Sequence, residues 1–171
     1  MSRQHRLLLV FLALFILPIV LAQVAFMAGW LKGGATVNKG ELINPPLSAQ
    51  ALFEDDHLWR LVYVMPASCQ AACQESLYIL GQTHLALGKE MDRVQPLVLG
   101  KAPTQVTDYP GLAFKGGAAT APLQPGQLYI ADPRGFVMLR YLPVQDRQQS
   151  LRLGKDMLTD LKKLLKQSQI G

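Results

Sequence analysis

One long and almost wholly apolar run lies near the start of the chain. The run extends from Leu7 to Met27, and no charged side chain occurs between Arg6 and Lys32. A helix rises about 1.5 Å per residue, so a run of this length matches a hydrocarbon core of about 30 Å. A cleavable signal peptide would have a shorter apolar region and a small-residue cleavage site, and the sequence has neither. The pattern therefore predicts a single membrane-spanning helix.

Shorter periodic segments follow this run, and they predict an α/β domain. Short runs of β-branched and aromatic residues predict buried strands, whereas apolar residues at steps of three and four predict helices. A strand, a helix and a strand in this order imply a parallel pair joined by a right-handed crossover. The turn at 132–135 has Pro second and Gly fourth, which favours a hairpin. The expected elements are a strand at 58–64, a helix from about 70 to 92, a strand at 94–99, a mostly irregular stretch at 100–126, strands at 128–131 and 136–142, and a helix around 157–165.

Composition divides the chain into three parts. Residues 1–30 are predicted to form a cytoplasmic N-terminus and a transmembrane anchor. Residues 31–56 are rich in Gly, Pro and Asn without a sustained period, so we expect a tether that leads into the domain. Residues 57–171 are then the folded domain.

Charge indicates the orientation of the anchor and excludes one class of partner. Arg3 and Arg6 precede the span, which favours a cytoplasmic N-terminus and, in a bacterium, a periplasmic domain held at the inner membrane. The formal charge of +5 is mostly a property of this anchor. Three of the 17 basic residues flank the span, and the rest nearly balance the 12 acidic residues. The domain therefore lacks the basic surface of a nucleic-acid-binding protein.

Cys69 and Cys73 are the only thiols, and they lie where the first predicted strand gives way to a helix. A C-x3-C pair at such a junction is close enough to form a disulfide or to bind a soft metal ion. The positive end of the helix favours thiolate over thiol, which makes the pair more reactive than structural cysteine. The alternative is that both are small apolar residues of the core.

The order of elements, with a cysteine pair after the first core strand and a hairpin and helix at the end, resembles the thioredoxin-like fold. The C-x3-C spacing and the segment 128–135, which reads LYIADPRG, are similar to the Sco/SenC branch of that fold over residues 58–165. Proteins of this branch are membrane-anchored and assist the maturation of cytochrome c oxidase. They bind copper through both cysteines and a histidine, or act as thiol-disulfide reductants of the oxidase copper site. The resemblance implies an α/β, thioredoxin-like fold with an N-terminal transmembrane helix.

The sequence also resembles a smaller group of proteobacterial single-span proteins associated with cytochrome oxidase assembly. The similar segments are Asn38-Lys39-Gly40-Glu41-Leu42, residues 77–91 and the ending 162–171. This resemblance implies a periplasm-facing protein of the bacterial inner membrane. Its expected partners are the membrane and a cytochrome c oxidase subunit or another copper or thiol assembly factor.

The copper ligand set of the Sco branch is incomplete in this sequence. Its histidine precedes the strand that ends in the Asp-Pro turn, and residues 121–127 contain no histidine. His84 lies eleven residues after Cys73, about 16 Å along a helix, and His57 begins the strand whose far end leads to the cysteines. Met65 is the remaining soft ligand. The fold also implies a cis-proline near the cysteines, for which Pro125 is the candidate.

Three functions stay open at this point. The first is an oxidase assembly protein in which Cys69 and Cys73 exchange disulfides and also handle Cu(I), with Cys69 attacking and Cys73 resolving. The second is a general thiol-disulfide oxidoreductase without a copper role. The third is a structural assembly scaffold in which the cysteines form a static disulfide.

Overall fold

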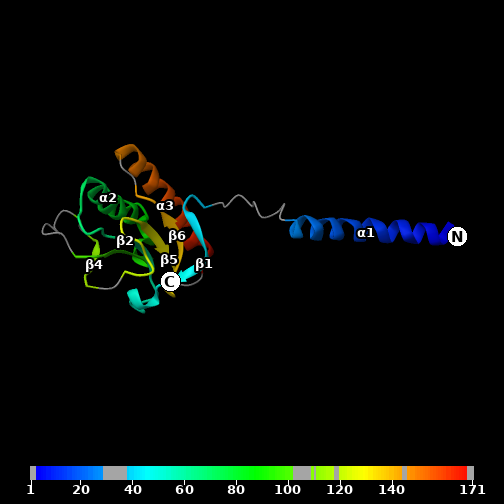
Figure 1. Cartoon of the computed structure of the whole chain (residues 1–171), viewed down its shortest axis with the longest axis horizontal. Coiled ribbons are helices and arrows are strands. Elements are labelled where there is room, and N and C mark those ends of the chain that lie inside the picture. The colour runs from blue at the N-terminus through cyan, green and yellow to red at the C-terminus, as the bar shows by residue number, and fades with distance from the viewer. Residues whose placement is uncertain are drawn as a thin grey trace. The chain divides into compact units, whose positions relative to one another are not determined.

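The computed structural model describes residues 3–28, 38–101, 109, 111–117, 120–143 and 146–168. Contacts divide the chain into two units, Met1–Val37 and Asn38–Gly171 (Figure 1). The elements in chain order are α1 (Arg3–Met27), β1 (Glu41–Ser48), the 3-10 helix η1 (Gln50–Leu52), β2 (Trp59–Val64), α2 (Ala71–Leu85), the 3-10 helix η2 (Gly88–Arg93), β3 (Val94–Leu99), β4 (Ala113–Lys115), β5 (Leu128–Ala131), β6 (Phe136–Tyr141) and α3 (Arg147–Gln167).

The first unit contains one apolar helix, α1, with Pro18 inside it. Among the described residues, α1 is the helix that is long and apolar enough to cross a membrane. Its large hydrophobic side chains are exposed, as expected for a helix whose solvent is lipid. The predicted N-terminal apolar helix is confirmed.

The second unit is a six-stranded mixed sheet in the order β1-β6-β5-β2-β3-β4. β2 pairs with β3 in parallel, and β5 pairs with β2 and β6 in antiparallel fashion. The β2-α2-β3 half supplies the predicted parallel pair, and the β5-β6-α3 half supplies the predicted hairpin and last helix. This mixed sheet is the α/β, thioredoxin-like architecture predicted from the sequence.

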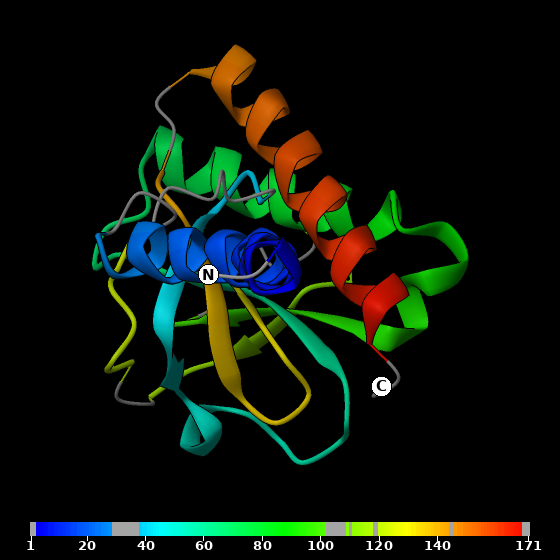
Figure 2. The same ribbon diagram turned by 90° about the vertical axis from the view of Figure 1, so that its right-hand side faces the viewer.

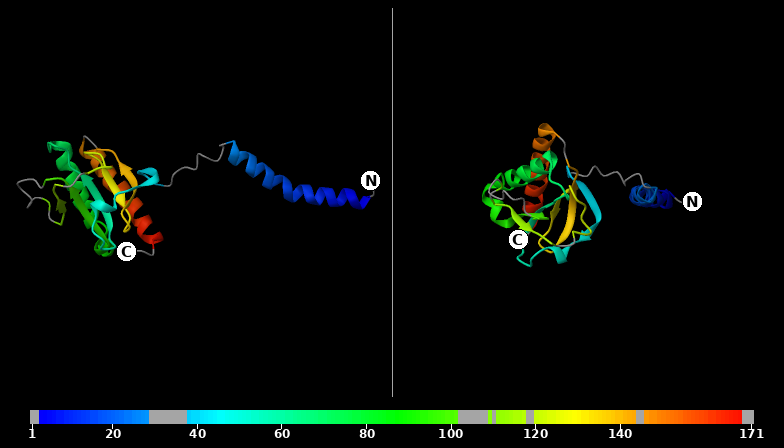
Figure 3. Two further views of the ribbon diagram at one scale, coloured as in Figure 1. Left: turned by 60° about the horizontal axis from the view of Figure 1, so that its bottom comes forward. Right: turned by 60° about the vertical axis from the view of Figure 1, so that its left-hand side comes forward.

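The central strands β2, β3 and β5 are buried on both faces, which explains why they read as mostly apolar runs. One face packs against α2 and α3, which lie side by side in Figure 2. The right-hand view of Figure 3 shows these helices on one side and β1 with the β5-β6 hairpin on the other. Leu61 and Tyr63 of β2 point to the helical face, while Val62 and Val64 join a second cluster that η1 covers.

The helix after the cysteines is shorter than predicted. α2 ends at Leu85, and η2 occupies the residues up to Arg93. Gly88, with φ of +61°, adopts a left-handed conformation that interrupts the α-helix. Leu87 is still buried. The apolar spacing therefore continues past the end of α2, which is why the sequence predicted a longer helix.

The segment expected to be a tether contains an edge strand. β1 pairs with β6, and Glu41 makes a bidentate ion pair with Arg140 at 2.7 and 3.1 Å. Residues from Asn38 onward belong to the folded unit. β1 contains two prolines and mostly exposed side chains, which is typical of an edge strand. It therefore lacks the alternating apolar pattern by which a strand is predicted from sequence.

A buried carboxylate fastens the beginning of the folded unit to its last helix. Asp160 of α3 is 1% exposed and accepts hydrogen bonds from the backbone amides of Lys39 and Gly40, each at 2.8 Å. The Tyr141 hydroxyl donates to the same carboxylate at 2.7 Å. Burial, together with this hydrogen bond, raises the pKa of Tyr141 far above its usual range. We name this group of four residues the Asp160 lock.

Candidate functional site

The backbone fixes the point at which β2 ends and the cysteine segment begins. The Val64 amide donates to the Gln127 carbonyl at 3.1 Å, and the Val64 carbonyl accepts from Gly126 at 2.7 Å. On the other side, the Met65 amide donates to Leu99 at 2.9 Å. Pairing on both sides holds the strand end in place, so the segment that follows starts from a rigid position.

The structure brings the two predicted site residues together. Cys69 and Cys73 form a disulfide with an S–S distance of 1.95 Å and a Cα–Cα distance of 5.1 Å. Cys73 is only 2% exposed and belongs to the core cluster beneath the helices, whereas Cys69 is partly exposed at its margin. A partner sulfur can therefore approach Cys69 more readily than Cys73.

The N-terminus of α2 adds a positive electrostatic contribution at this pair. Gln70 is the N-cap residue, and its side chain makes no capping hydrogen bond. The Cys73 amide donates to the Gln70 carbonyl at 2.9 Å, and the first-turn amides have no side-chain acceptor from Gln70. These amides and the helix dipole favour negative charge on a reduced sulfur beside them.

A tyrosine of β2 lies in the same core cluster as Cys73. Tyr63 is buried, and burial raises the pKa of its hydroxyl, an effect partly offset by a hydrogen bond with Ser76. Ser76 in turn donates to the Ala72 carbonyl at 2.8 Å. The Tyr63 hydroxyl therefore stays protonated at physiological pH, and sequence reasoning did not single out either hydroxyl.

A surface hollow of about 340 Å³ begins next to the cysteine turn. Its lining comes from three parts of the chain, which are Ala71, Gln74, Glu75 and Tyr78 of α2, Tyr109, and Arg147 of α3. The Arg147 guanidinium lies over the Tyr78 ring, 5.8 Å from its centroid. Arg147 follows the cysteines by more than seventy residues, so sequence spacing gave no signal for it.

Two of the histidines lie away from the cysteines, as the spacing predicted. His84 Nε2 contacts the carbonyl oxygens of Val94 at 2.8 Å and Met91 at 3.0 Å, which connects α2 to the start of β3. His57 is exposed and borders a different hollow together with Pro133 and Gly135 of the β5-β6 turn. Neither histidine is placed to complete a site with the two sulfurs.

Among the described residues, the site offers a metal ion the sulfurs of Cys69 and Cys73. No group of three His, Cys, Asp or Glu side chains suited to a metal ion occurs within the described ranges. The stretch 121–127 does reach the end of β2, but it carries a polar network instead of a histidine. Tyr129 donates to Gln127 Oε1 at 2.8 Å and accepts from the Gln124 amide at 2.9 Å. Met65 packs against the core cluster that contains Cys73.

The candidate for the cis-proline was wrong by three residues. The peptide bond Ala121–Pro122 is cis, whereas the bond before Pro125 is not. Matching the downstream Asp-Pro turn gave an approximate position, but the isomer of an X-Pro bond leaves no pattern in one sequence.

Comparison with known proteins identifies the class. The family described as "Transmembrane-like, thioredoxin-like, C-terminal domain" matches residues 59–168. The chain therefore belongs to this family. No curated protein matches the sequence.

Several solved structures are similar to this chain at low sequence identity. Copper-bound Sco1 from yeast is 16% identical, with 65% of this chain and 80% of that chain covered and a TM-score of 0.48. A SCO1/SenC family lipoprotein from Bacillus anthracis is 13% identical, covering 64% and 82%, with a TM-score of 0.46. A putative thiol:disulfide interchange protein DsbE from Chlorobium tepidum is 16% identical, covering 72% and 96%, with a TM-score of 0.44.

Proposed function

We propose that the protein is a membrane-anchored thiol-disulfide exchange protein that acts on the periplasmic side of the bacterial inner membrane during cytochrome c oxidase assembly. The observation that carries the proposal is the disulfide between a partly exposed Cys69 and a buried Cys73 at the start of α2. Two cysteines with unequal access, next to a helix N-terminus on a thioredoxin-like fold, suit exchange with a partner.

The unequal exposure assigns a role to each sulfur. In the reduced pair, the Cys69 thiolate attacks one sulfur of a client disulfide, and the other client sulfur leaves as a thiolate. The Cys73 thiolate then attacks the Cys69 sulfur and releases the client as a dithiol. The client gains two electrons, and the protein becomes the disulfide seen here, which a dithiol reductant returns to the starting state.

A membrane anchor would favour even a weak interaction between this protein and a membrane-bound client. If α1 spans the membrane, the domain and a membrane-bound oxidase subunit occupy the same surface, which raises their effective concentration. The proposed orientation rests on Arg3 and Arg6 before the span. Alkaline phosphatase, which needs an oxidising compartment, should be active when fused after residue 171. Activity of a C-terminal reporter only in the cytoplasm would reverse the orientation.

Copper enters this proposal as cargo. Thiolates are the soft ligands that Cu(I) prefers, so the reduced pair offers it two-sulfur coordination. Without a third ligand of the His, Cys, Asp or Glu type in the described residues, we expect transfer rather than long retention. The client would be an oxidase subunit with a copper site or another copper or thiol assembly factor.

Exchange can be tested on the purified full chain in detergent with a disulfide-bonded peptide. We expect Cys69→Ser to abolish peptide reduction, because it removes the attacking sulfur. Cys73→Ser should instead accumulate a mixed disulfide through Cys69, visible as a mass increase that dithiothreitol reverses. Ser68→Ala, a change of the exposed neighbour, is the matched control and should keep full activity. A mixed disulfide that never forms in Cys73→Ser would contradict the assigned roles.

A second set of measurements separates exchange from the two alternatives. A static structural disulfide would have a reduction potential below about −300 mV, and oxidase activity would be normal in membranes that carry Cys69→Ser with Cys73→Ser. A copper role predicts that the reduced chain binds one Cu(I) and that either serine variant loses it. Disulfide exchange without any Cu(I) binding would favour a general thiol-disulfide oxidoreductase. The observation that supports this alternative is the absence of a histidine from residues 121–127.

A further inference from the structure

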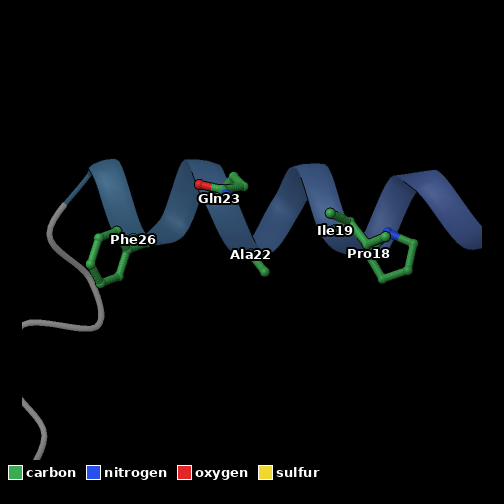
Figure 4. Close-up of a pocket in the computed structure, with 5 residues that line it drawn as sticks. All are labelled: Pro18, Ile19, Ala22, Gln23 and Phe26. Carbon is green, nitrogen blue, oxygen red and sulfur yellow. The ribbon is translucent and has the colours of Figure 1, made fainter.

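α1 carries a shallow depression on one side of the helix. Figure 4 shows its lining, which is Pro18, Ile19, Ala22, Gln23 and Phe26, and its volume is about 590 Å³. These positions recur at steps of three and four, so they share one face. The small side chain of Ala22 lies between larger neighbours and leaves space for side chains of another helix.

Gln23 gives this face a polar group that needs a partner. It is the only polar side chain between Leu7 and Met27. Its amide has no hydrogen-bond partner within the part of the chain that the structure describes. Pro18 leaves a second polar group without its usual partner. Proline has no amide hydrogen, so it cannot donate to the Leu14 carbonyl. In hydrocarbon, such groups are satisfied by neighbouring helices.

The chemistry of the glutamine amide favours an identical partner. Copies of one anchor insert with the same orientation, so a two-fold pair of α1 helices is parallel and places each residue opposite its own equivalent. A glutamine amide has both a donor and an acceptor and can therefore pair with itself. Ile19 and Phe26, four residues before and three after Gln23, extend the contact at the spacing of a left-handed helix pair.

We propose that the α1 face containing Ile19, Gln23 and Phe26 pairs with the same face of a second copy of this chain in the membrane. The paired Gln23 amides set the register, and the depression beside Ala22 receives side chains of the partner helix. This inference depends on the membrane-spanning role of α1 but not on the exchange chemistry of the cysteines.

The test uses the full chain, with its disulfide intact, in phosphatidylcholine vesicles. Donor and acceptor fluorescent proteins are fused after residue 171, and energy transfer is followed as the protein-to-lipid ratio changes. We expect a dimer whose dissociation constant rises about 3- to 30-fold in Gln23→Leu, given typical intramembrane hydrogen bonds. Leucine is more apolar than glutamine, so loss of pairing in this variant would not come from failed insertion.

A swapped variant keeps the composition but moves the amide. Gln23→Leu combined with Leu21→Gln moves the amide about 200° around the helix, away from the face that contains Ile19 and Phe26. We expect this variant to pair as weakly as Gln23→Leu alone. Three results would overturn the proposal: a natural chain that stays monomeric, a dimer that Gln23→Leu does not weaken, or a swapped variant that pairs as tightly as the natural chain. Peptide reduction through Cys69 should be unchanged throughout, which separates this test from that of the exchange activity.

Discussion

Replacing Asp160 with alanine is expected to lower the free energy of unfolding of the folded unit by about 3–5 kcal/mol. The carboxylate is 1% exposed and accepts from the Lys39 and Gly40 amides and from the Tyr141 hydroxyl. Alanine would leave these donors without their acceptor, and at least two of them are buried. Guanidinium unfolding of the full chain in detergent micelles, followed by tryptophan fluorescence, measures the change.

Two further variants test whether the hydrogen bonds of the Asp160 lock account for this loss of stability. Asp156→Asn removes a carboxylate one turn earlier on α3 that makes no hydrogen bond among the described residues, and it should change stability by less than about 0.5 kcal/mol. Tyr141→Phe removes one donor and should cost about 1–2 kcal/mol. Because both partners share one hydrogen bond, the double variant with Asp160→Ala should cost less than the sum. An Asp160→Ala chain as stable as the Asp156 control would rule out this role for the lock.

Gly135→Ala should destabilise the folded unit by about 2–4 kcal/mol for two separate reasons. Gly135 has φ of +83°, a conformation that L-residues with a side chain disfavour. A Cβ there would also lie 2.8 Å from the Gln50 Cα, which belongs to the backbone of η1 and cannot rotate away. The β5-β6 turn and η1 would have to separate, which would break the 2.9 Å hydrogen bond from the Ala49 amide to the Gly135 carbonyl.

Gly126→Ala is the matched control for this substitution. Gly126 has nearly the same backbone angle, with φ of +81°, but a Cβ there would meet nothing within 4 Å. We expect a loss of about 1 kcal/mol from the backbone conformation alone. Equal losses in the two variants, measured by the same denaturant unfolding, would show that the contact with η1 contributes nothing.

Strands buried on both faces were the most predictable part of the fold. The strands expected at 94–99 and 128–131 have the same bounds as β3 and β5. Each of these runs is followed by a turn-forming residue, Gly100 or Asp132, so the sequence marks where the strand ends. β1 gave no such signal, because its stability comes from β6 and from the ion pair of Glu41 with Arg140, ninety-nine residues away. A local pattern does not encode a long-range partner.

In the candidate site, too, features that depend on neighbouring residues were predictable, whereas features that depend on long-range contacts were not. The C-x3-C spacing and the strand-to-helix junction predicted that Cys69 and Cys73 would meet, because both signals lie within a few residues. The unequal exposure of the two sulfurs depends on what packs above α2, and the hollow beside them depends on Arg147 from α3. Those features require the tertiary fold, as does the cis bond before Pro122.

The Asp160 lock also determines where mechanical force enters the folded unit. When the membrane or a bound partner pulls on the chain before Asn38, tension reaches the domain at Lys39 and Gly40. From there it passes into α3 through the buried carboxylate and into β6 through the β1 ladder. The cysteine turn between β2 and α2 takes part in none of these contacts, so a pull on the anchor does not load the two sulfurs directly.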